Sequence, residues 1–321
     1  MQRRGLLKAG AFSIAAAFSQ RLPGQKSDPV PVIDAHIHLF DPTRPGGVPW
    51  PEKSDSILYK PALPDRYKQV TERLGVRGAI AVECSSLETD NDWLLGTAAS
   101  DPVIVGVIGD LVPGSGSFGT DLDRLAANPL FRGIRYGNLW NRNLLMDLDK
   151  PGFVDGLKAL ASAKLVLESA NPDGNLIAAL VRVKERVPEL TIVADHLPNQ
   201  ALPADATGKV EYRKNLERLA KSPGIFIKLS EIPQKIDGKV VLDPTFYRSK
   251  LDDLWDIFGE NRVIFGSDWP NSDHLADYTA TFRLVKSYMA TKSAAAQEKY
   301  FWRNSIAAYR WKPRTKDQAS L

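Results

Sequence analysis

Short apolar runs alternate with amphipathic runs along most of the chain. The apolar runs are rich in Val and Ile and are mostly continuous, which is typical of parallel strands that are buried on both faces. Eight such runs predict strands at Val32–Phe40, Val76–Cys84, Val103–Leu111, Phe131–Tyr136, Lys164–Ser169, Leu190–His196, Ile225–Ser230 and Val263–Asp268.

The segments between these runs predict helices. Leu176, Leu180, Val183 and Val187, for example, fall on one helical face. Strands that alternate with helices indicate a parallel sheet, and eight of them in about 250 residues indicate a single (β/α)8 TIM barrel. A doubly wound sheet is the alternative that fits the same pattern. We expect residues 31–321 to form one barrel domain, with C-terminal helices on its outside.

The first 19 residues differ from the rest of the chain. They contain Arg3, Arg4 and Lys8, then an apolar stretch, and no acidic residue. This composition is typical of a secretory signal, and the arginine pair resembles the bacterial twin-arginine signal. We therefore expect a signal peptide at residues 1–19, a linker at 20–30, and a periplasmic or otherwise exported protein. A disordered N-terminus or an uncleaved membrane anchor is the alternative.

Composition excludes several classes of partner. The 321 residues include 42 Lys and Arg against 38 Asp and Glu, and without the leader the basic residues number 39. No basic stripe is visible, so we expect no nucleic-acid partner. No apolar run is long enough to span a membrane in the mature chain. One Cys can form neither an internal disulfide nor a cysteine-rich metal site. We expect a small-molecule substrate, and a homo-oligomer is left open.

Histidines and one aspartate gather at the predicted carboxyl ends of strands, where TIM barrels carry their chemistry. His36 and His38 end the first strand on one face, so that both imidazoles could bind one metal ion. His196 ends the sixth strand and Asp268 the eighth. Each residue alone also fits a core histidine or a helix cap. Together they include three of the four histidines, which favours an active centre.

Further charged groups end other strands. Glu83 ends the second strand, Arg135 the fourth and Glu168 the fifth. Arginine suits a carboxylate or a developing oxyanion, because its donors form a fixed fork. We expect a catalytic role for Arg135 and substrate contacts for Glu83 and Glu168. An ion pair between Arg135 and one of the two glutamates, without catalysis, is the alternative.

A long proline-rich loop at residues 41–63 carries Trp50. Long loops in compact domains are often functional lids, and a rigid surface excursion is the alternative. We expect Trp50 and Trp269 to form an apolar wall of the substrate pocket. Asp34 is expected on the same strand face as His36, where it would orient the imidazole.

Six segments together resemble the amidohydrolase superfamily: VIDAHIHLF, VPWP, LETDNDWLL, GIRYG, ADHLPN and GSDWP. They are most similar to its sugar-lactonase-like branch, which includes fuconolactonase-like and pyrone-dicarboxylate-lactonase-like hydrolases. The resemblance implies that His36, His38, His196 and Asp268 form the active centre. It also implies a divalent metal there, often zinc, although some lactonases of this branch work without one. The chain departs from the branch at Pro198-Asn199, which bears on the substrate.

We therefore expect an exported, metal-dependent hydrolase that opens a sugar-derived or dicarboxylic lactone with an activated water. One zinc ion would be held by the four residues of the active centre. Asp268 would act as general base, with help from His196 and Arg135. We see no lysine and no extra carboxylate that would bridge a second ion. A metal-free mechanism, a decarboxylase or hydratase, and a non-catalytic binding barrel remain alternatives.

Overall fold

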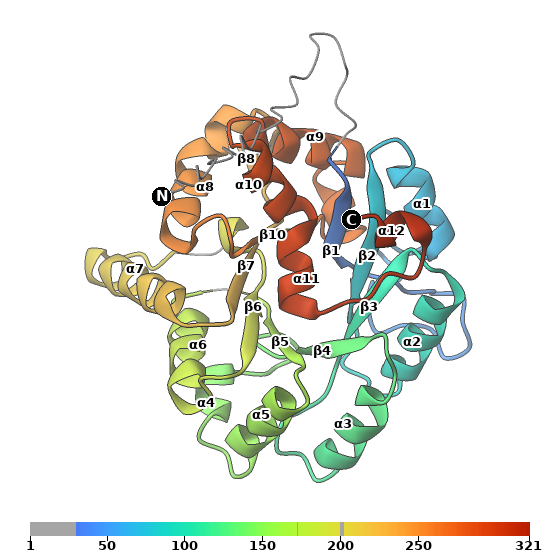
Figure 1. The fold of residues 1–321 in the computed structure, drawn as a ribbon, viewed down its shortest axis with the longest axis vertical. Coiled ribbons are helices and arrows are strands. Elements are labelled where there is room, and N and C mark those ends of the chain that lie inside the picture. The colour runs from blue at the N-terminus through green and yellow to red at the C-terminus, as the bar shows by residue number, and fades with distance from the viewer. Residues whose placement is uncertain (1–29, 172, 200–201) are drawn as a thin grey trace, which may run out of the picture.

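The computed structural model describes residues 30–171, 173–199 and 202–321. The expected signal peptide and nearly all of the expected linker lie outside these residues. Eight parallel strands form a ring that is surrounded by helices (Figure 1). These strands are β1 (Val32–Ile37), β2 (Val76–Val82), β3 (Ile104–Gly109), β4 (Phe131–Arg135), β5 (Val166–Ser169), β6 (Thr191–Ala194), β7 (Ile225–Leu229) and β10 (Val263–Phe265).

The strands pair in chain order from β1 to β7, and β10 pairs with β7. The ring closes between β10 and β1, where the backbone N–H of Asp268 donates to the carbonyl of His36 at 2.9 Å. The N–H of His38 donates to the carbonyl of Trp269 at 2.7 Å. The expected (β/α)8 barrel is confirmed, and a doubly wound sheet is excluded.

Helices follow most of the strands and cover the outside of the ring. The predicted helix around Leu180 is α6, and the Asp173 side chain caps it by accepting from the N–H of Leu176. The α-helices are α1 (Pro64–Thr71), α2 (Asp90–Ser100), α3 (Phe118–Ala126), α4 (Leu144–Asp147), α5 (Phe153–Ser162), α6 (Gly174–Arg186), α7 (Ala206–Lys221), α8 (Pro244–Phe258), α9 (Tyr278–Met289), α10 (Ala294–Glu298), α11 (Asn304–Tyr309) and α12 (Lys316–Ala319). Short turns are η1 (Leu197–Asn199), η2 (Asn271–His274) and the π-helical η3 (Lys299–Arg303).

An antiparallel hairpin lies outside the barrel between β7 and α8. Its strands are β8 (Gln234–Ile236) and β9 (Lys239–Val241), and Asp237 and Gly238 form the left-handed turn. The apolar pattern did not predict it, since both strands are short and half-exposed. No helix in the described ranges is both long and apolar enough to cross a membrane.

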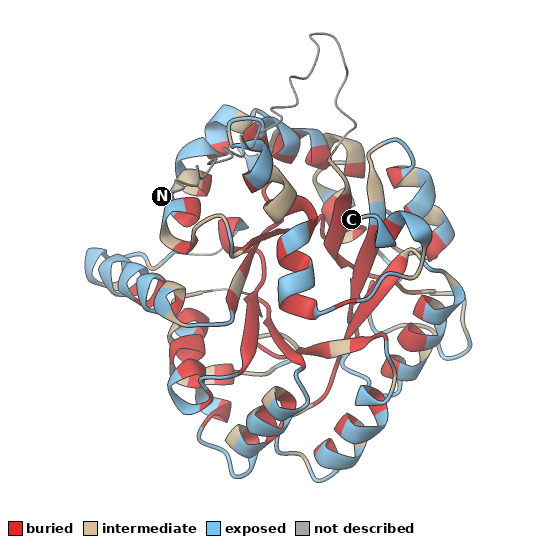
Figure 2. Cartoon of the chain, in the orientation of Figure 1, coloured by how far each residue is buried: buried red, intermediate tan, exposed pale blue. Residues whose placement is uncertain are grey.

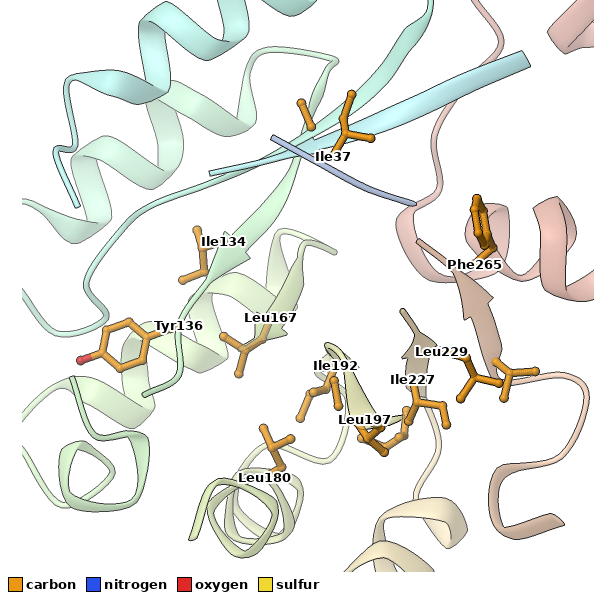
Figure 3. Close-up of a cluster of buried hydrophobic side chains, with 14 of the residues drawn as sticks. Ile37, Ile134, Tyr136, Leu167, Leu180, Ile192, Leu197, Ile227, Leu229 and Phe265 are labelled. Carbon is orange, nitrogen blue, oxygen red and sulfur yellow. The ribbon is translucent and has the colours of Figure 1, made fainter. Parts of the chain in front are cut away.

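The core has two parts, and the strands are buried almost throughout (Figure 2). Between strands and helices, Leu167, Ile192 and Ile227 belong to the same apolar cluster as Leu180 of α6 (Figure 3). Burying a side chain of this size stabilises the fold by about 1.5–3 kcal/mol relative to exposure.

The C-terminal segment lies outside the strand ring, as expected, and covers its amino-terminal end. Figure 1 shows α11 crossing the middle of the ring. Tyr309 and Trp311 pack with strand residues such as Ile33 and Ile264. The side chain of Asn304 donates to the carbonyls of Glu260 at 2.9 Å and Val263 at 2.8 Å. The carboxyl end of the ring is therefore the end that remains available for a site.

Candidate active site

Closure of the barrel brings the ends of β1, β6 and β10 together. The Oδ1 atom of Asp268 lies 3.1 Å from Nε2 of His38, 3.4 Å from Nε2 of His36 and 3.9 Å from Nε2 of His196. All four side chains are buried. The structure thus places the four residues of the expected active centre in one cluster, which we call the His–Asp cluster.

Two of the imidazoles have defined partners on the side away from Asp268. Nδ1 of His38 lies 3.0 Å from the carbonyl oxygen of Val82. A carbonyl only accepts, so Nδ1 carries the proton and Nε2 presents its lone pair to Asp268. Nδ1 of His196 lies 2.8 Å from the hydroxyl of Ser230. A lone pair that faces a carboxylate oxygen needs a proton or a cation between the two atoms.

The residues that follow several strands have left-handed backbone conformations. A non-glycine residue pays a steric cost in this region, and such residues gather at functional sites. Their side chains turn toward the mouth of the barrel rather than continuing the strand. They are Trp140 (φ 56°), Asn171 (φ 57°), His196 (φ 52°), Glu231 (φ 49°) and Asp268 (φ 61°).

A cavity of about 270 Å³ opens above the His–Asp cluster. Three of the four cluster residues line it, and an aromatic side chain of the long loop closes one side, with the Trp50 ring 5.8 Å from that of His38. The lining residues are His38, Trp50, Cys84, Arg135, Leu139, Trp140, Ala170, Asn171, His196, Glu231, Asp268 and Asn271.

Arg135 is the one Lys or Arg side chain among the described residues that line this cavity. Its Nε donates to Oε1 of Glu83 at 2.6 Å, and its Nη2 donates to the Glu83 carbonyl at 2.6 Å. The indole N–H of Trp140 donates to Oε2 of Glu83 at 3.2 Å. Glu83 therefore neutralises the guanidinium and fixes both Arg135 and Trp140 against the cavity wall.

Two carboxyl groups of the cavity lining meet at Asn271. The side-chain amide of Asn271 donates to Oδ2 of Asp268 at 2.7 Å and to Oε1 of Glu231 at 3.0 Å. Burial raises the pKa of Asp268 well above its usual range, and the negative charge of Glu231 raises it further. Burial also acts to raise the pKa of Glu231, but the charge of His196 and a hydrogen bond from Asp268 outweigh it and hold that pKa at about 2. The proton of this carboxyl pair therefore resides on Asp268.

Burial also affects His38, one of the two histidines that line the cavity. It lowers the pKa of His38 to about 4, and the positive charge of Arg135 contributes in the same direction. His38 is therefore neutral at neutral pH, in agreement with the lone pair that its Nε2 presents to Asp268.

Below the cavity, a buried group of charges connects to His36. Nζ of Lys228 lies 2.9 Å from Nδ1 of His36, 2.8 Å from Oε1 of Glu168 and 3.1 Å from Oδ1 of Asp195. The hydroxyl of Tyr309 donates to Oε1 of Glu168 at 2.5 Å. We call Lys228, Glu168, Asp195 and Tyr309 the Lys228 cluster. Buried charges require partners, and the members of this cluster pair with one another. The cluster contacts His36 at Nδ1, while Nε2 of His36 faces Asp268.

The sequence did not reveal several residues of this region, and Lys228, Glu231 and Asn271 show why. Lys228 interrupts the apolar strand IFIKL, and a lysine in a buried parallel strand was a usable signal that it has a specific partner. Glu231 lies two residues after the seventh strand, much as His196 and Asp268 lie two and three residues after theirs. For Asn271, which lies in a short turn after the last strand, the sequence carries no comparable signal.

Three of the expected substrate contacts lie outside the lining of the cavity. Glu168 is fully buried in the Lys228 cluster, away from the cavity. Trp269 is also fully buried, between Tyr67 and the guanidinium of Arg66. Glu83 pairs with Arg135, as the alternative reading of that arginine had it, and does not line the cavity itself. Of the expected contacts, Trp50 does line the cavity.

Asp34 does not orient the imidazole of His36. The register of β1 against β2 shifts between Asp34 and Ile37, and this shift interrupts the alternation of strand faces. The Asp34 carboxylate instead accepts from the hydroxyls of Tyr67 at 3.1 Å and Tyr278 at 2.9 Å. It also accepts from the backbone N–H of Ser267 at 2.9 Å. Asp34 therefore ties together the two strand ends that carry the His–Asp cluster.

The His–Asp cluster has donors and spacing that fit a divalent cation. Ligand atoms bound tetrahedrally to zinc at about 2.0–2.1 Å are roughly 3.3 Å from one another. His36, His38 and Asp268 each offer one ligand atom within 4.8 Å of the others, and so do His196, Glu231 and Asp268. Oδ1 of Asp268 lies 3.1 Å from Nε2 of His38 and 3.4 Å from Nε2 of His36, near this value. Nε2 of His36 is buried and has no hydrogen-bond partner among the described residues. Imidazole nitrogen and carboxylate oxygen are also the ligands that zinc accepts.

The sequence model of the family described as Amidohydrolase matches residues 33–311. The chain belongs to this family. An L-fucono-1,5-lactonase of Burkholderia ambifaria is 29% identical over 260 residues, which cover 77% of this chain and 84% of that protein. An L-fucono-1,5-lactonase of Burkholderia multivorans is 26% identical over 286 residues, or 86% of this chain and 94% of that protein. The expected hydrolase of the amidohydrolase superfamily is thereby confirmed.

Solved structures show the same fold. An amidohydrolase from Burkholderia multivorans with bound zinc superposes with a TM-score of 0.75 at 22% identity. The match covers 88% of this chain and 100% of that chain. At this level of identity the likeness establishes the barrel, and the chemistry of the site has to be argued from the residues themselves.

Proposed function

We propose that this amidohydrolase is a lactonase that opens a neutral sugar lactone, such as L-fucono-1,5-lactone, by attack of water. The charge of the cavity is the observation that carries this choice. Arg135, the one Lys or Arg side chain among the described residues that line it, is already paired with Glu83, while Glu231 and Asp268 add carboxyl groups to the same lining. A dicarboxylic lactone would bring further negative charges beside the Glu231 carboxylate, and like charges at short range are unfavourable.

Polar groups around the cavity suit a polyhydroxy ring. Glu231 accepts hydrogen bonds from substrate hydroxyls, and the amides of Asn171 and Asn271 both donate and accept. The indole of Trp50 supplies an apolar face for the ring carbons. The volume, about 270 Å³, lies just below the range of roughly 300–1,000 Å³ that holds drug-sized ligands, which favours a single small ring. Two relatives named as L-fucono-1,5-lactonases support this substrate class.

Asp268 acts as the general base. Its ionised form takes a proton from water as the water oxygen attacks the lactone carbonyl. The ring C–O bond then breaks, and the same carboxyl returns the proton to the leaving ring oxygen, so that a hydroxy acid is formed. Arg135 and His196 stabilise the oxyanion that develops on the carbonyl oxygen.

Zinc is the cofactor that the donor set favours. His36, His38, His196 and Asp268 would hold the ion, which when bound polarises the carbonyl and acidifies water.

Residues 1–19 have the pattern of a twin-arginine export signal, so we propose an exported, periplasmic enzyme. Replacing Arg3 and Arg4 by lysine should retain the protein in the cytoplasm. Export at the unchanged level would contradict this part of the proposal.

Isotope incorporation tests the reaction class. L-Fucono-1,5-lactone is turned over in ¹⁸O-labelled water, and the product is analysed by mass spectrometry. Hydrolysis predicts one labelled oxygen in the product carboxylate at a rate that depends on the enzyme. A product that has lost carbon dioxide, or a lactone that binds and is never turned over, would contradict the proposal.

A further inference from the structure

Two side chains contact Nδ1 of His36, and they require opposite protonation states of that nitrogen. Nζ of Lys228 lies 2.9 Å from its Nδ1, and Oδ1 of Asp195 lies 3.6 Å from the same atom. A lysine ammonium only donates, and a carboxylate only accepts. Lys228 can therefore contact Nδ1 only when that nitrogen lacks a proton, whereas Asp195 can bind it only when it carries one.

Whether Nδ1 carries the proton decides whether Nε2 of His36 has a lone pair for a cation in the His–Asp cluster. A neutral imidazole has one proton, so contact with Lys228 leaves the proton on Nε2, which faces Asp268. In that tautomer Nε2 has no lone pair for a cation. Contact with Asp195 leaves the proton on Nδ1 and the lone pair on Nε2, which is the arrangement in which metal-binding histidines are held by carboxylates.

The contacts favour the first of these tautomers in the metal-free protein. The Lys228 contact is short, whereas the Asp195 distance exceeds the usual range of hydrogen bonds. Both oxygens of Asp195 also lack a hydrogen-bond partner among the described residues, although Oδ1 lies 3.1 Å from the Lys228 ammonium. Asp195 therefore lies near Nδ1 of His36 and has oxygens free to accept a hydrogen bond from a protonated Nδ1.

We infer that Lys228 and Asp195 are opposing positioning residues that set the metal affinity of the His–Asp cluster through the tautomer of His36. Lys228 holds the imidazole as the Nε2–H form and weakens binding of a divalent cation. Asp195 stabilises the Nδ1–H form and strengthens it. The inference concerns the cluster alone and holds whichever ester the enzyme opens.

The tautomer can be observed directly in the unmodified protein. The chain has four histidines, so selective ¹⁵N labelling gives a small set of ring signals to assign. In zinc-stripped protein, His36 should show a protonated Nε2 and an unprotonated Nδ1, whereas His38 should show the reverse because its Nδ1 donates to the Val82 carbonyl. A protonated Nδ1 on His36 in the zinc-stripped protein would overturn the inference.

Zinc affinity supplies a second and independent readout. Removing Lys228 alone would leave two buried carboxylates without their cation, so Lys228→Met is combined with Glu168→Gln and compared with Glu168→Gln alone. The double variant should bind zinc at least about tenfold more tightly than its matched background, and Asp195→Asn should bind at least about tenfold more weakly than the wild type, since partners of metal-bound histidines typically change affinity 10–100-fold.

The opposite signs of the two effects distinguish this mechanism from general damage to the site, which would weaken binding in both variants. Titration calorimetry with zinc ions measures both, and circular dichroism verifies the fold of each variant. Equal or weaker zinc binding by the double variant would overturn the inference. If the double variant does not fold, the nitrogen signals of the wild type decide the question.

Discussion

Asp268 derives its chemical character from four neighbours: the imidazoles of His36 and His38, Glu231 and Asn271. Replacing Asp268 by Asn keeps the shape but removes the base, and turnover of a lactone should fall by at least about 10²-fold. Glu217→Gln, an isosteric change of an exposed residue on α7, is the matched control and should retain full activity. Turnover of the Asp268 variant within a few-fold of the wild type would contradict its role as base.

Glu231 should set the pH range in which Asp268 works. Asp268 acts as a base only when ionised, and its pKa is raised by burial and by the charge of Glu231. Activity of the wild type should therefore fall as pH decreases through this raised pKa. Glu231→Gln removes the charge, lowers the pKa of Asp268 and should move the acid limb of the kcat/KM profile to lower pH. An acid limb that stays at the same pH or moves to higher pH would contradict the effect of Glu231 on the pKa of Asp268.

At the scale of residues, the sequence predicted the members of the His–Asp cluster but not their surroundings. His36, His196 and Asp268 were predictable because parallel strands of a barrel end on one side. The position of Asp34 was not, since a register shift in β1 reverses the face it occupies. Nor was the contact between Lys228 and His36, which depends on how two strands far apart in the chain are placed around the ring.

At the scale of elements, α11 stabilises the end of the barrel opposite the site. Asn304 is buried, and its amide satisfies the carbonyls of Glu260 and Val263. Asn304→Ala leaves both acceptors without this donor and should reduce the free energy of unfolding by about 1–3 kcal/mol. The activity of the folded fraction should be unchanged. Urea denaturation measures the effect, and Ile306→Ala, a change of an exposed residue on the same helix, should alter stability far less.

The long loop between β1 and α1 contributes a wall to the cavity. Phe40 pairs with Ala62 at its base, Nη2 of Arg44 donates to Asp90 at 2.7 Å, and Nε2 of His274 lies 2.8 Å from Oδ2 of Asp55. Trp50→Ala should raise KM for a lactone severalfold and change kcat less, because the indole contacts the ring and no reacting atom. A loss confined to kcat would contradict this role. The sequence predicted a long loop here but not these anchors.

At the scale of the whole molecule, stability and chemistry occupy opposite ends of one barrel. The eight barrel strands could be predicted because buried parallel strands are continuous apolar runs. The β8–β9 hairpin escaped prediction since short, half-exposed strands lack that pattern. The charge of the cavity could not be read from the chain either, because it arises from the pairing of Arg135, at the end of β4, with Glu83, which follows β2 on the other side of β3.

The most direct test of the account is acid release from a matched panel of lactones, followed with a pH indicator. The panel contains L-fucono-1,5-lactone, other neutral sugar lactones and dicarboxylic lactones, and spontaneous opening is subtracted. Because Arg135 is already paired and two carboxyl groups share the cavity lining, kcat/KM for the best neutral sugar lactone should exceed that for every dicarboxylic lactone by at least about tenfold, or about 1.4 kcal/mol. A preference for a dicarboxylic lactone, or no enzyme-dependent release from any member of the panel, would contradict it.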